Sequence, residues 1–287
     1  MASILDRYGI KEVADVTFYT INKTTGQPDK PVLYLDTLKV STIEQTAETV
    51  DARGGKGNPK LVTWDYGKEI NVTIEDALFS AKSMAIMFGD GTVTLSDTTG
   101  VTVNRAATVR ATTTALPDYI TADIYDSIEG SKRVKLYMGS ENNAPAGSVK
   151  FNGQITLVGV FDELGTELKN SDASITTAAA WQAATAVAGN KYVVKYTVKA
   201  VTKTISVGAD TFPGTYYVQG DTYARSDVDG SDQFFQFIIP KAKMTSENTI
   251  TLEAEGDPAV FNMNLTVLRP EDGEMMKLVQ YDLVSNS

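Results

Sequence analysis

The chain has 287 residues, enough for one large β domain or two ordinary domains, and its 42% hydrophobic and 22% charged composition is that of a globular protein. It contains no cysteine and no histidine, which excludes disulfides, thiolate nucleophiles and the commonest general base and transition-metal ligands. The formal net charge of −10 argues against a basic groove that wraps nucleic acid. Carboxylate-pair catalysis and calcium binding through oxygen ligands remain possible.

Alternation of apolar and polar residues predicts strands along the first quarter of the chain. The pattern is found in VADVTFYTI, VLYLDTLKV and KEINVTIEDALF, which begin at residues 13, 32 and 68. Turn-forming residues separate these strands at 26–31, 54–59 and 65–67. Charges within MASILDRYGIKE lead us to expect no secretory signal, and no stretch approaches the roughly 20 apolar residues of a membrane-spanning helix.

The turn at 54–59 belongs to a basic, glycine-rich stretch, ARGGKGNPK, that superficially suggests a phosphate-binding loop. Such a loop needs a lysine followed directly by serine or threonine, but Lys56 is followed by Gly57 and Lys60 by Leu61. The stretch also continues into KLVTW, whose branched and aromatic residues favour a strand over a phosphate-binding helix. We therefore reject nucleotide binding and expect no cofactor.

A short helix is predicted in SAKSMAIMFG. Ser80 can cap its N-terminus, and Gly89 offers a left-handed stop at its end. We expect Met84, Met87 and Phe88 to share the side that packs against a sheet.

The middle of the chain carries weaker signals. Residues 92–116 contain few large side chains and indicate an edge hairpin or an extended excursion. Strands resume in segments that begin at 118, 133 and 148, the last with expected bulges near Gly153 and Gly159. The alanine-rich segment TTAAAWQAATAVAGNKYVV leaves helix and non-helix equally open.

A basic stripe follows in KYVVKYTVKAVTKTISV. Lysines recur every four residues, which places them on one strand face, opposite Val194, Tyr196 and Val198. The stripe is either a solvated face or, in an oligomer of acidic subunits, a docking edge. Its members are Lys191, Lys195, Lys199 and Lys203.

Three groups of residues in the chain invite a chemical interpretation. SDVDGSDQ carries Asp227, Asp229 and Asp232 like a calcium loop, but it lacks the EF-hand spacing and closing glutamate, so we expect a hairpin turn. Glu253 and Glu255 share a strand face that alternation places outward, which disfavours the raised pKa that a catalytic acid needs. Aromatic residues that could form sugar-stacking platforms are Trp64, Trp181, Tyr216 and Tyr217.

Two regions resemble the tail tube proteins of long-tailed bacteriophages. The first is ARGGKGNPKLVTWDYGKEINVTIEDALFSAKSMAIMFGDG, where a long loop precedes a strand and a short flanking helix. The second, FFQFIIPKAKMTSENTITLEAEGDPAVFNMNLTVLRPEDGEMMKLVQYDL, is similar to the closing strands of those proteins. Together they cover a little under a third of the chain, in pattern and order and without a catalytic signature.

The resemblance implies a mostly β protein, an antiparallel β-sandwich or barrel with one short flanking helix, as a single domain over 1–287 with insertions at about 92–117 and 171–210. It implies a non-enzymatic virion protein, made in the host cytoplasm, that forms stacked six-membered rings as a conduit for the genome. Its expected partners are copies of itself and other tail proteins. DNA passes through the lumen without specific binding, and no membrane or metal is expected.

The resemblance also gives the glycine-rich stretch a role that needs no ligand. We expect it to be a long loop that a neighbouring subunit captures, with Arg53, Lys56 and Lys60 facing acidic surfaces of that neighbour. The expected inter-subunit loop consists of Arg53, Gly54, Gly55, Lys56, Gly57, Asn58, Pro59 and Lys60.

Other functions stay open at this point. A baseplate ring or a capsid decoration protein would share the expected fold. A carbohydrate-binding β-sandwich would be a monomer that binds glycans through its exposed aromatic residues.

Overall fold

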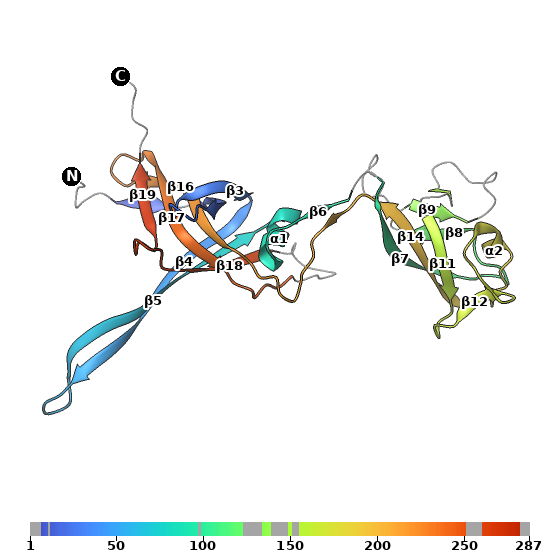
Figure 1. The fold of residues 1–287 in the computed structure, drawn as a ribbon, viewed down its shortest axis with the longest axis horizontal. Helices are drawn as coiled ribbons and strands as arrows, with labels where there is room; N and C mark the ends of the chain where they lie inside the picture. Colours follow the sequence, from blue (N-terminus) through green and yellow to red (C-terminus); the bar gives the residue numbers. More distant parts are fainter. Residues whose placement is uncertain are drawn as a thin grey trace, which may run out of the picture. The chain divides into compact units, whose positions relative to one another are not determined.

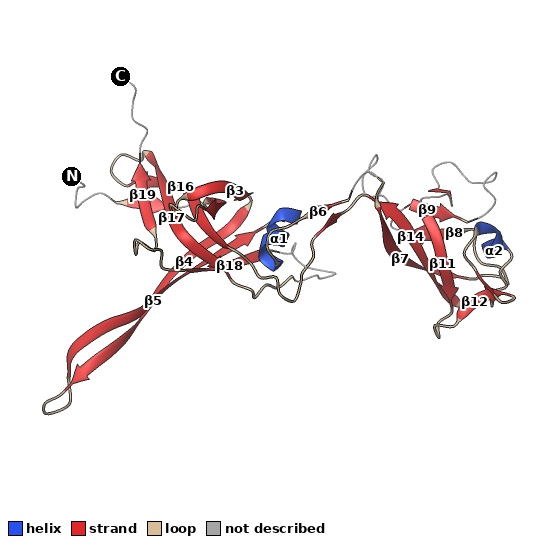
Figure 2. Cartoon of the chain, viewed as in Figure 1, coloured by secondary structure: helices blue, strands red, loops and turns tan. Residues whose placement is uncertain are grey.

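The computed structural model describes residues 7–10, 12–96, 99–122, 134–138, 149–150, 155–250 and 260–281. In these residues the protein is mostly antiparallel β with two helices, and its sheets are not closed into a barrel (Figures 1 and 2). The expected fold class, a β-sandwich type with a short flanking helix, is confirmed in this form.

The chain divides into two compact units. Unit 1 comprises Met1–Thr94 and Thr204–Ser287, and unit 2 comprises Leu95–Lys203. The chain passes to unit 2 at β6 (Thr94–Leu95) and returns at β15 (Lys203–Thr204), and these two strands pair with each other. The expected insertions at about 92–117 and 171–210 lie mostly within unit 2, and a single domain with insertions stays a prediction.

Unit 1 is built on a nine-stranded antiparallel sheet. Seven strands follow the order β3-β2-β16-β17-β18-β5-β4, while β1 pairs with β16 and β19 with β17. The strands are β1 (Tyr8–Ile10), β2 (Asp15–Ile21), β3 (Pro28–Leu35), β4 (Leu38–Arg53), β5 (Lys60–Asp76), β16 (Thr215–Ser226), β17 (Asp232–Met244), β18 (Phe261–Val267) and β19 (Lys277–Tyr281).

Alternate residues of these strands form the core of unit 1. Ile70, Val72 and Ile74 of β5 are at most 3% exposed, as the period-two pattern predicts. They belong to one hydrophobic cluster with side chains from β2, β3, β16, β17 and β18. Because residues from both ends of the strand order meet in this cluster, the sheet curves around a shared core without closing into a barrel.

Helix α1 (Ala81–Phe88) packs into the same cluster through Ile86 and Met87. Ser80 caps it as predicted: its hydroxyl accepts from the Ser83 backbone N–H at 3.0 Å, and the Ser83 hydroxyl accepts from the Ser80 N–H at 2.8 Å. The predicted packing face is correct for Met87, which is buried, and for Phe88, which is half-buried against the cluster, whereas Met84 is half-buried and does not belong to the cluster.

The predicted helix stop is also wrong in its geometry. Gly89 has φ −158°, which is extended backbone, whereas Gly91 has φ +81°. The N–H groups of both glycines donate to the Ala85 carbonyl oxygen at 3.0 Å. Two glycines, and not a single left-handed one, therefore end the helix.

One predicted turn is a bulge in the structure. Strand β5 continues through residues 65–67, and Gly67, at φ +60°, lies opposite the register shift between Thr46 and Glu48 of β4. An extra residue with positive φ in one strand is the usual role of glycine in a bulge, so turn composition alone misled the prediction. The first predicted turn ends earlier than expected, since β3 begins at Pro28.

Unit 2 has a five-stranded sheet in the order β13-β12-β11-β14-β7 and a three-stranded sheet in the order β10-β9-β8. The register of β11 shifts between Leu157 and Gly159, so the bulge predicted near Gly159 is confirmed; Gly153 lies outside the described residues. The strands are β7 (Val101–Arg110), β8 (Tyr119–Ala122), β9 (Val134–Tyr137), β10 (Val149–Lys150), β11 (Ile155–Phe161), β12 (Glu167–Asn170), β13 (Ala173–Ser174) and β14 (Lys191–Ala200).

The alanine-rich segment contains one short helix, α2 (Ala178–Gln182), capped by Thr177. Trp181 of this helix is 1% exposed, and its indole N–H donates to the Pro117 carbonyl oxygen at 3.0 Å. The rest of the segment passes through Gly189, at φ +91°, into β14. Unit 2 thus has a hydrophobic cluster of its own, centred on Trp181, Tyr192 and Tyr196.

Candidate functional site

The β4–β5 hairpin extends beyond the strand that supports it in the sheet of unit 1. The two strands pair from Leu38 and Asp76 to Arg53 and Lys60, but β18 pairs with β5 only from Asn71 to Asp76. Residues 45–53 and 60–70 therefore form a two-stranded ribbon with no further strand partner among the described residues (Figure 1). The nine residues of 45–53 correspond to a ribbon of about 30 Å.

The ribbon is amphipathic across its two faces. Directly opposed residues lie on the same face of a sheet, and the pairs Val50–Trp64 and Ala52–Val62 alternate with the polar pairs Thr49–Asp65 and Asp51–Thr63. We call one side the apolar ribbon face. It consists of Val50, Val62, Trp64 and Tyr66, whose side chains are 51%, 48%, 54% and 53% exposed.

An isolated two-stranded hairpin is marginally stable in water, and a contiguous set of exposed apolar side chains marks an interaction surface. Sequence reasoning missed this face because it treated residues 53–60 as the functional segment and Trp64 as a separate aromatic residue. The signal was present as period-two alternation in TVDAR and KLVTWDY on either side of the turn.

The expected inter-subunit loop forms the tip of this hairpin. It is shorter than expected, because the strands extend to Arg53 and restart at Lys60. The turn needs positive φ at Gly55, Gly57 and Asn58, with values of 83°, 86° and 52°. The glycines therefore serve the tight reversal, and an inter-subunit role for residues 53–60 stays a prediction.

Two of the three cations at the tip are already paired within the chain. The Asp51 carboxylate lies 2.7 Å from Lys60 Nζ and 3.3 Å from Arg53 Nη2, and it accepts from the Thr63 hydroxyl at 2.8 Å. The hydrogen bond from Lys60 is the largest cause that lowers the pKa of Asp51, followed by that from Thr63. Lys56 forms no ion pair with any residue that the structure describes, so it is the tip cation free to meet a neighbour.

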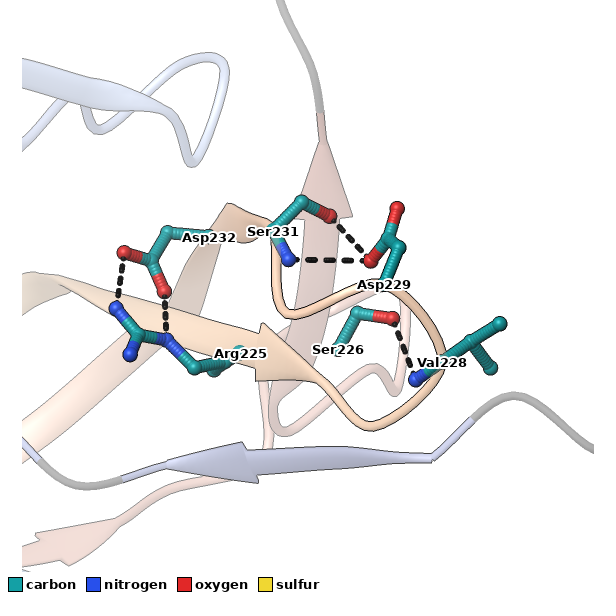
Figure 3. A network of polar contacts seen from close by, with 6 residues as sticks. All are labelled: Arg225, Ser226, Val228, Asp229, Ser231 and Asp232. Carbon is teal, nitrogen blue, oxygen red and sulfur yellow. Dashed lines mark hydrogen bonds and ion pairs between the residues drawn. The ribbon is translucent and has the colours of Figure 1, made fainter.

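The aspartate cluster in SDVDGSDQ is a hairpin turn, as predicted. Asp229 accepts from the Ser231 N–H at 3.1 Å and hydroxyl at 2.8 Å, and Asp232 pairs with Arg225 through two bonds of 2.6 and 2.7 Å (Figure 3). These contacts use the carboxylates to close the turn. No group of three acidic side chains placed to hold a metal ion occurs in the described ranges.

The remaining sequence candidates do not come together. Trp181 is buried in unit 2, and Tyr216 and Tyr217 are 7% and 8% exposed in unit 1, so of the four proposed sugar-stacking residues only Trp64 is exposed. The carboxylates of Glu253 and Glu255 lie outside the described residues.

The basic stripe has the predicted geometry along β14, but the prediction is wrong for Lys203. Along β14, Lys191, Lys195 and Lys199 are exposed while Tyr192 and Tyr196 are buried, so the lysines share the outer face of the strand. Lys203 lies beyond this strand, in β15.

An uncovered apolar ribbon of this kind is typical of proteins that associate with other protein surfaces. The model of the YomU/Tube protein family matches residues 8–116 and 140–280, so the chain belongs to this family of phage tail tube proteins. None of the curated proteins matches the chain. The resemblance seen in the sequence is thereby confirmed, and the protein has a structural role in the tail tube of the virion.

The described residues contain no helix that is long and apolar enough to cross a membrane.

Proposed function

We propose that this protein assembles into rings of six copies that stack as the tail tube, and that the apolar ribbon face is a principal contact between copies. The observation that carries the proposal is the pairing of Val50 with Trp64 and of Ala52 with Val62 on one exposed side of a ribbon that lacks other support. Membership of the tube family supports the proposal, because a tube is built from many copies of a subunit.

The energetics favour this use of the ribbon. Burying the exposed halves of four large apolar side chains contributes on the order of 3–6 kcal/mol before the cost of association. The same contact would order a hairpin that is marginal alone. A ribbon that seats on a different surface of the next copy makes a heterologous contact, which closes into a ring or continues as a filament.

Charge suits passage of the genome through such an assembly. Unit 1 has 15 basic and 26 acidic residues, a formal charge of −11. A lumen lined by carboxylates repels phosphate groups, so DNA would pass without adhering, whereas a basic wall would retain it. In this proposal the protein is made in the host cytoplasm, meets other tail proteins at the ends of the tube and carries out no catalysis.

Negative-stain microscopy of the purified protein with a paired variant tests the proposal. Trp64→Ser with Tyr66→Ser should leave the subunit folded, because both side chains lie outside the core, but should abolish tubes. Tyr34→Ser is the matched control, since Tyr34 is 58% exposed on β3 and lies outside the ribbon. Circular dichroism and the melting temperature report folding for all three proteins.

Tubes of normal length from the double variant would refute the role of the ribbon. A wild-type protein that forms only single closed rings would instead favour a terminal ring or a decoration protein. A strictly monomeric wild type that binds oligosaccharides would favour the carbohydrate-binding alternative.

A further inference from the structure

Charge is divided unevenly between the two units. Unit 2 contains 11 basic and 10 acidic residues, a formal charge of +1, whereas unit 1 carries −11. Copies of a chain with net charge −10 repel one another when they are packed closely, so an assembly of this chain needs contacts that offset the repulsion. Unit 2 is the unit in which basic residues outnumber acidic residues.

A group of cations of unit 2 lies on the outer face of its five-stranded sheet. Lys191, Lys195 and Lys199 follow one another along β14, each about 13 Å from the next. Arg110 lies on the neighbouring strand β7, directly opposite Lys191. We call these four residues the basic sheet face.

Apolar side chains are exposed among these cations. Val193, 38% exposed, lies between Lys191 and Lys195, and Val158, 47% exposed, lies at the bulge of β11. The Lys195 ammonium lies 5.4 Å from the centroid of the Phe161 ring. A surface with an apolar centre and charged surroundings resembles a protein interface more closely than a fully solvated strand face does.

The acidic side chains of unit 2 that the structure describes leave the lysine ammonium groups of the basic sheet face unpaired. Within the described ranges, Lys191, Lys195 and Lys199 form no ion pair. The Glu163 carboxylate accepts from the Lys191 backbone N–H at 3.3 Å, and Glu167 pairs with Lys169 at 3.6 Å. The Arg110 guanidinium donates to the Gly189 carbonyl oxygen at 3.1 Å, which fixes the side chain without cancelling its charge.

We propose that the basic sheet face docks on the acidic unit 1 of a second copy of this chain. The inference rests on the proposed self-assembly, which brings unit 1 of other copies close to unit 2. Opposite charges then attract over a screening distance of about 8–10 Å at ordinary salt, and the exposed valines add apolar contact at short range. The contact thereby offsets part of the repulsion between acidic subunits.

The first test measures the critical concentration for assembly of the full-length protein by sedimentation. Replacing Lys191, Lys195 and Lys199 together by Gln should raise it about tenfold at low salt, as expected for three exposed charge contacts. The difference from wild type should shrink at 0.5 M NaCl, where screening is strong. The triple Lys→Arg variant keeps the charge and should assemble like wild type.

Lys23, Lys30 and Lys39 provide the matched control. They are exposed on unit 1 and form no ion pair with described residues, so replacing them by Gln changes the net charge by the same amount. If general repulsion governs assembly, the two Gln variants will weaken it equally, and the docking proposal is overturned. If docking is correct, the control, which makes unit 1 more acidic, will assemble at least as well as wild type.

The second test identifies the partner directly. Assemblies made from equal amounts of unlabelled and ¹⁵N-labelled protein are treated with a carbodiimide, which joins a lysine amine to a carboxylate only when they touch. We expect mixed-isotope peptides that link lysines of the basic sheet face to Asp or Glu of unit 1. Links within single chains only, or binding of this face to added polyphosphate with no such links, would overturn the proposal, whereas absence of any wild-type assembly would refute the proposed function instead.

Discussion

At the scale of single residues, the pair Gly220 and Phe237 shows how one glycine can be required by packing alone. The two residues are directly opposite each other on β16 and β17, and a Cβ atom built on Gly220 would lie 2.1 Å from the Phe237 ring. The ring is 4% exposed and belongs to the core of unit 1, so it has little room to move. The missing side chain of Gly220 thus leaves the space that the Phe237 ring occupies.

Gly220→Ala should therefore destabilise unit 1 by about 1–3 kcal/mol, the usual cost of overpacking a close-packed core. Thermal unfolding followed by circular dichroism would show a fall of several degrees in melting temperature. Gly9→Ala is the control, because nothing lies within 4 Å of a Cβ atom at that position. Equal melting temperatures for the two variants would contradict the packing argument.

The pKa of Asp51 gives a prediction about pH. Its pKa lies below the ordinary value of 3.8, chiefly through the Lys60 hydrogen bond, so the ionised form is favoured in the folded hairpin. A lowered carboxylate pKa contributes stability above the ordinary value, and this contribution is lost as the pH falls through the lowered one. Carboxyl carbon NMR should give a midpoint below 3.8 for Asp51, and the tip amides should lose protection only in that acidic range. A midpoint at or above 3.8 would show that the ion pairs with Lys60 and Arg53 do not form in solution.

At the scale of elements, the strands that were predicted best are those with one buried face. The alternation of Ile70, Val72 and Ile74 in β5 and of the lysines in β14 fixed both strand identity and side-chain direction, since a one-residue slip would expose the apolar set. Ser80 correctly predicted the start of α1, because its hydroxyl caps the helix through a local hydrogen bond.

Elements whose form depends on a partner strand were predicted less well. Gly67 reads as part of a turn when only its neighbours are considered, but its position opposite the Thr46–Glu48 register shift makes it a bulge. The prediction that Gly89 alone ends α1 was wrong for a similar reason, because the Gly91 N–H also donates to the last turn of the helix. Both outcomes depend on backbone hydrogen bonds whose partners the local sequence does not identify.

The β4–β5 ribbon depends both on the local sequence and on its partner strands. Its length follows from where β18 stops pairing, which is a property of the sheet, whereas its amphipathic character follows from alternation along each strand. An extension of the sheet whose side chains are mostly exposed is the kind of surface that the proposed contact between copies needs.

At the scale of the whole molecule, the chain separates into units that each have their own hydrophobic cluster. The strands that carry the chain between the units, β6 and β15, pair side by side, so the two ends of unit 2 are close together. Replacing residues 96–202 by a short Gly-Ser linker should therefore leave unit 1 folded, since the cost of closing a short loop is small.

Circular dichroism and the melting temperature of this deletion protein would check the prediction, with the full chain as reference. We expect cooperative unfolding with strand content retained. A deletion protein that is unfolded or aggregates would show that the core of unit 1 depends on unit 2.

The sequence by itself determined the β class, the positions of the strongly alternating strands, the capped helix and the resemblance to tail tube proteins, because these depend on residue types and on spacing within one segment. Only the tertiary structure decided that Asp51 already holds Arg53 and Lys60, that Val50 and Trp64 share an exposed face, and that the middle of the chain forms a unit with a core of its own. Each of these results is a pairing between segments, and the free energy that selects one pairing among many comes from long-range burial and hydrogen bonding that no single stretch of sequence records.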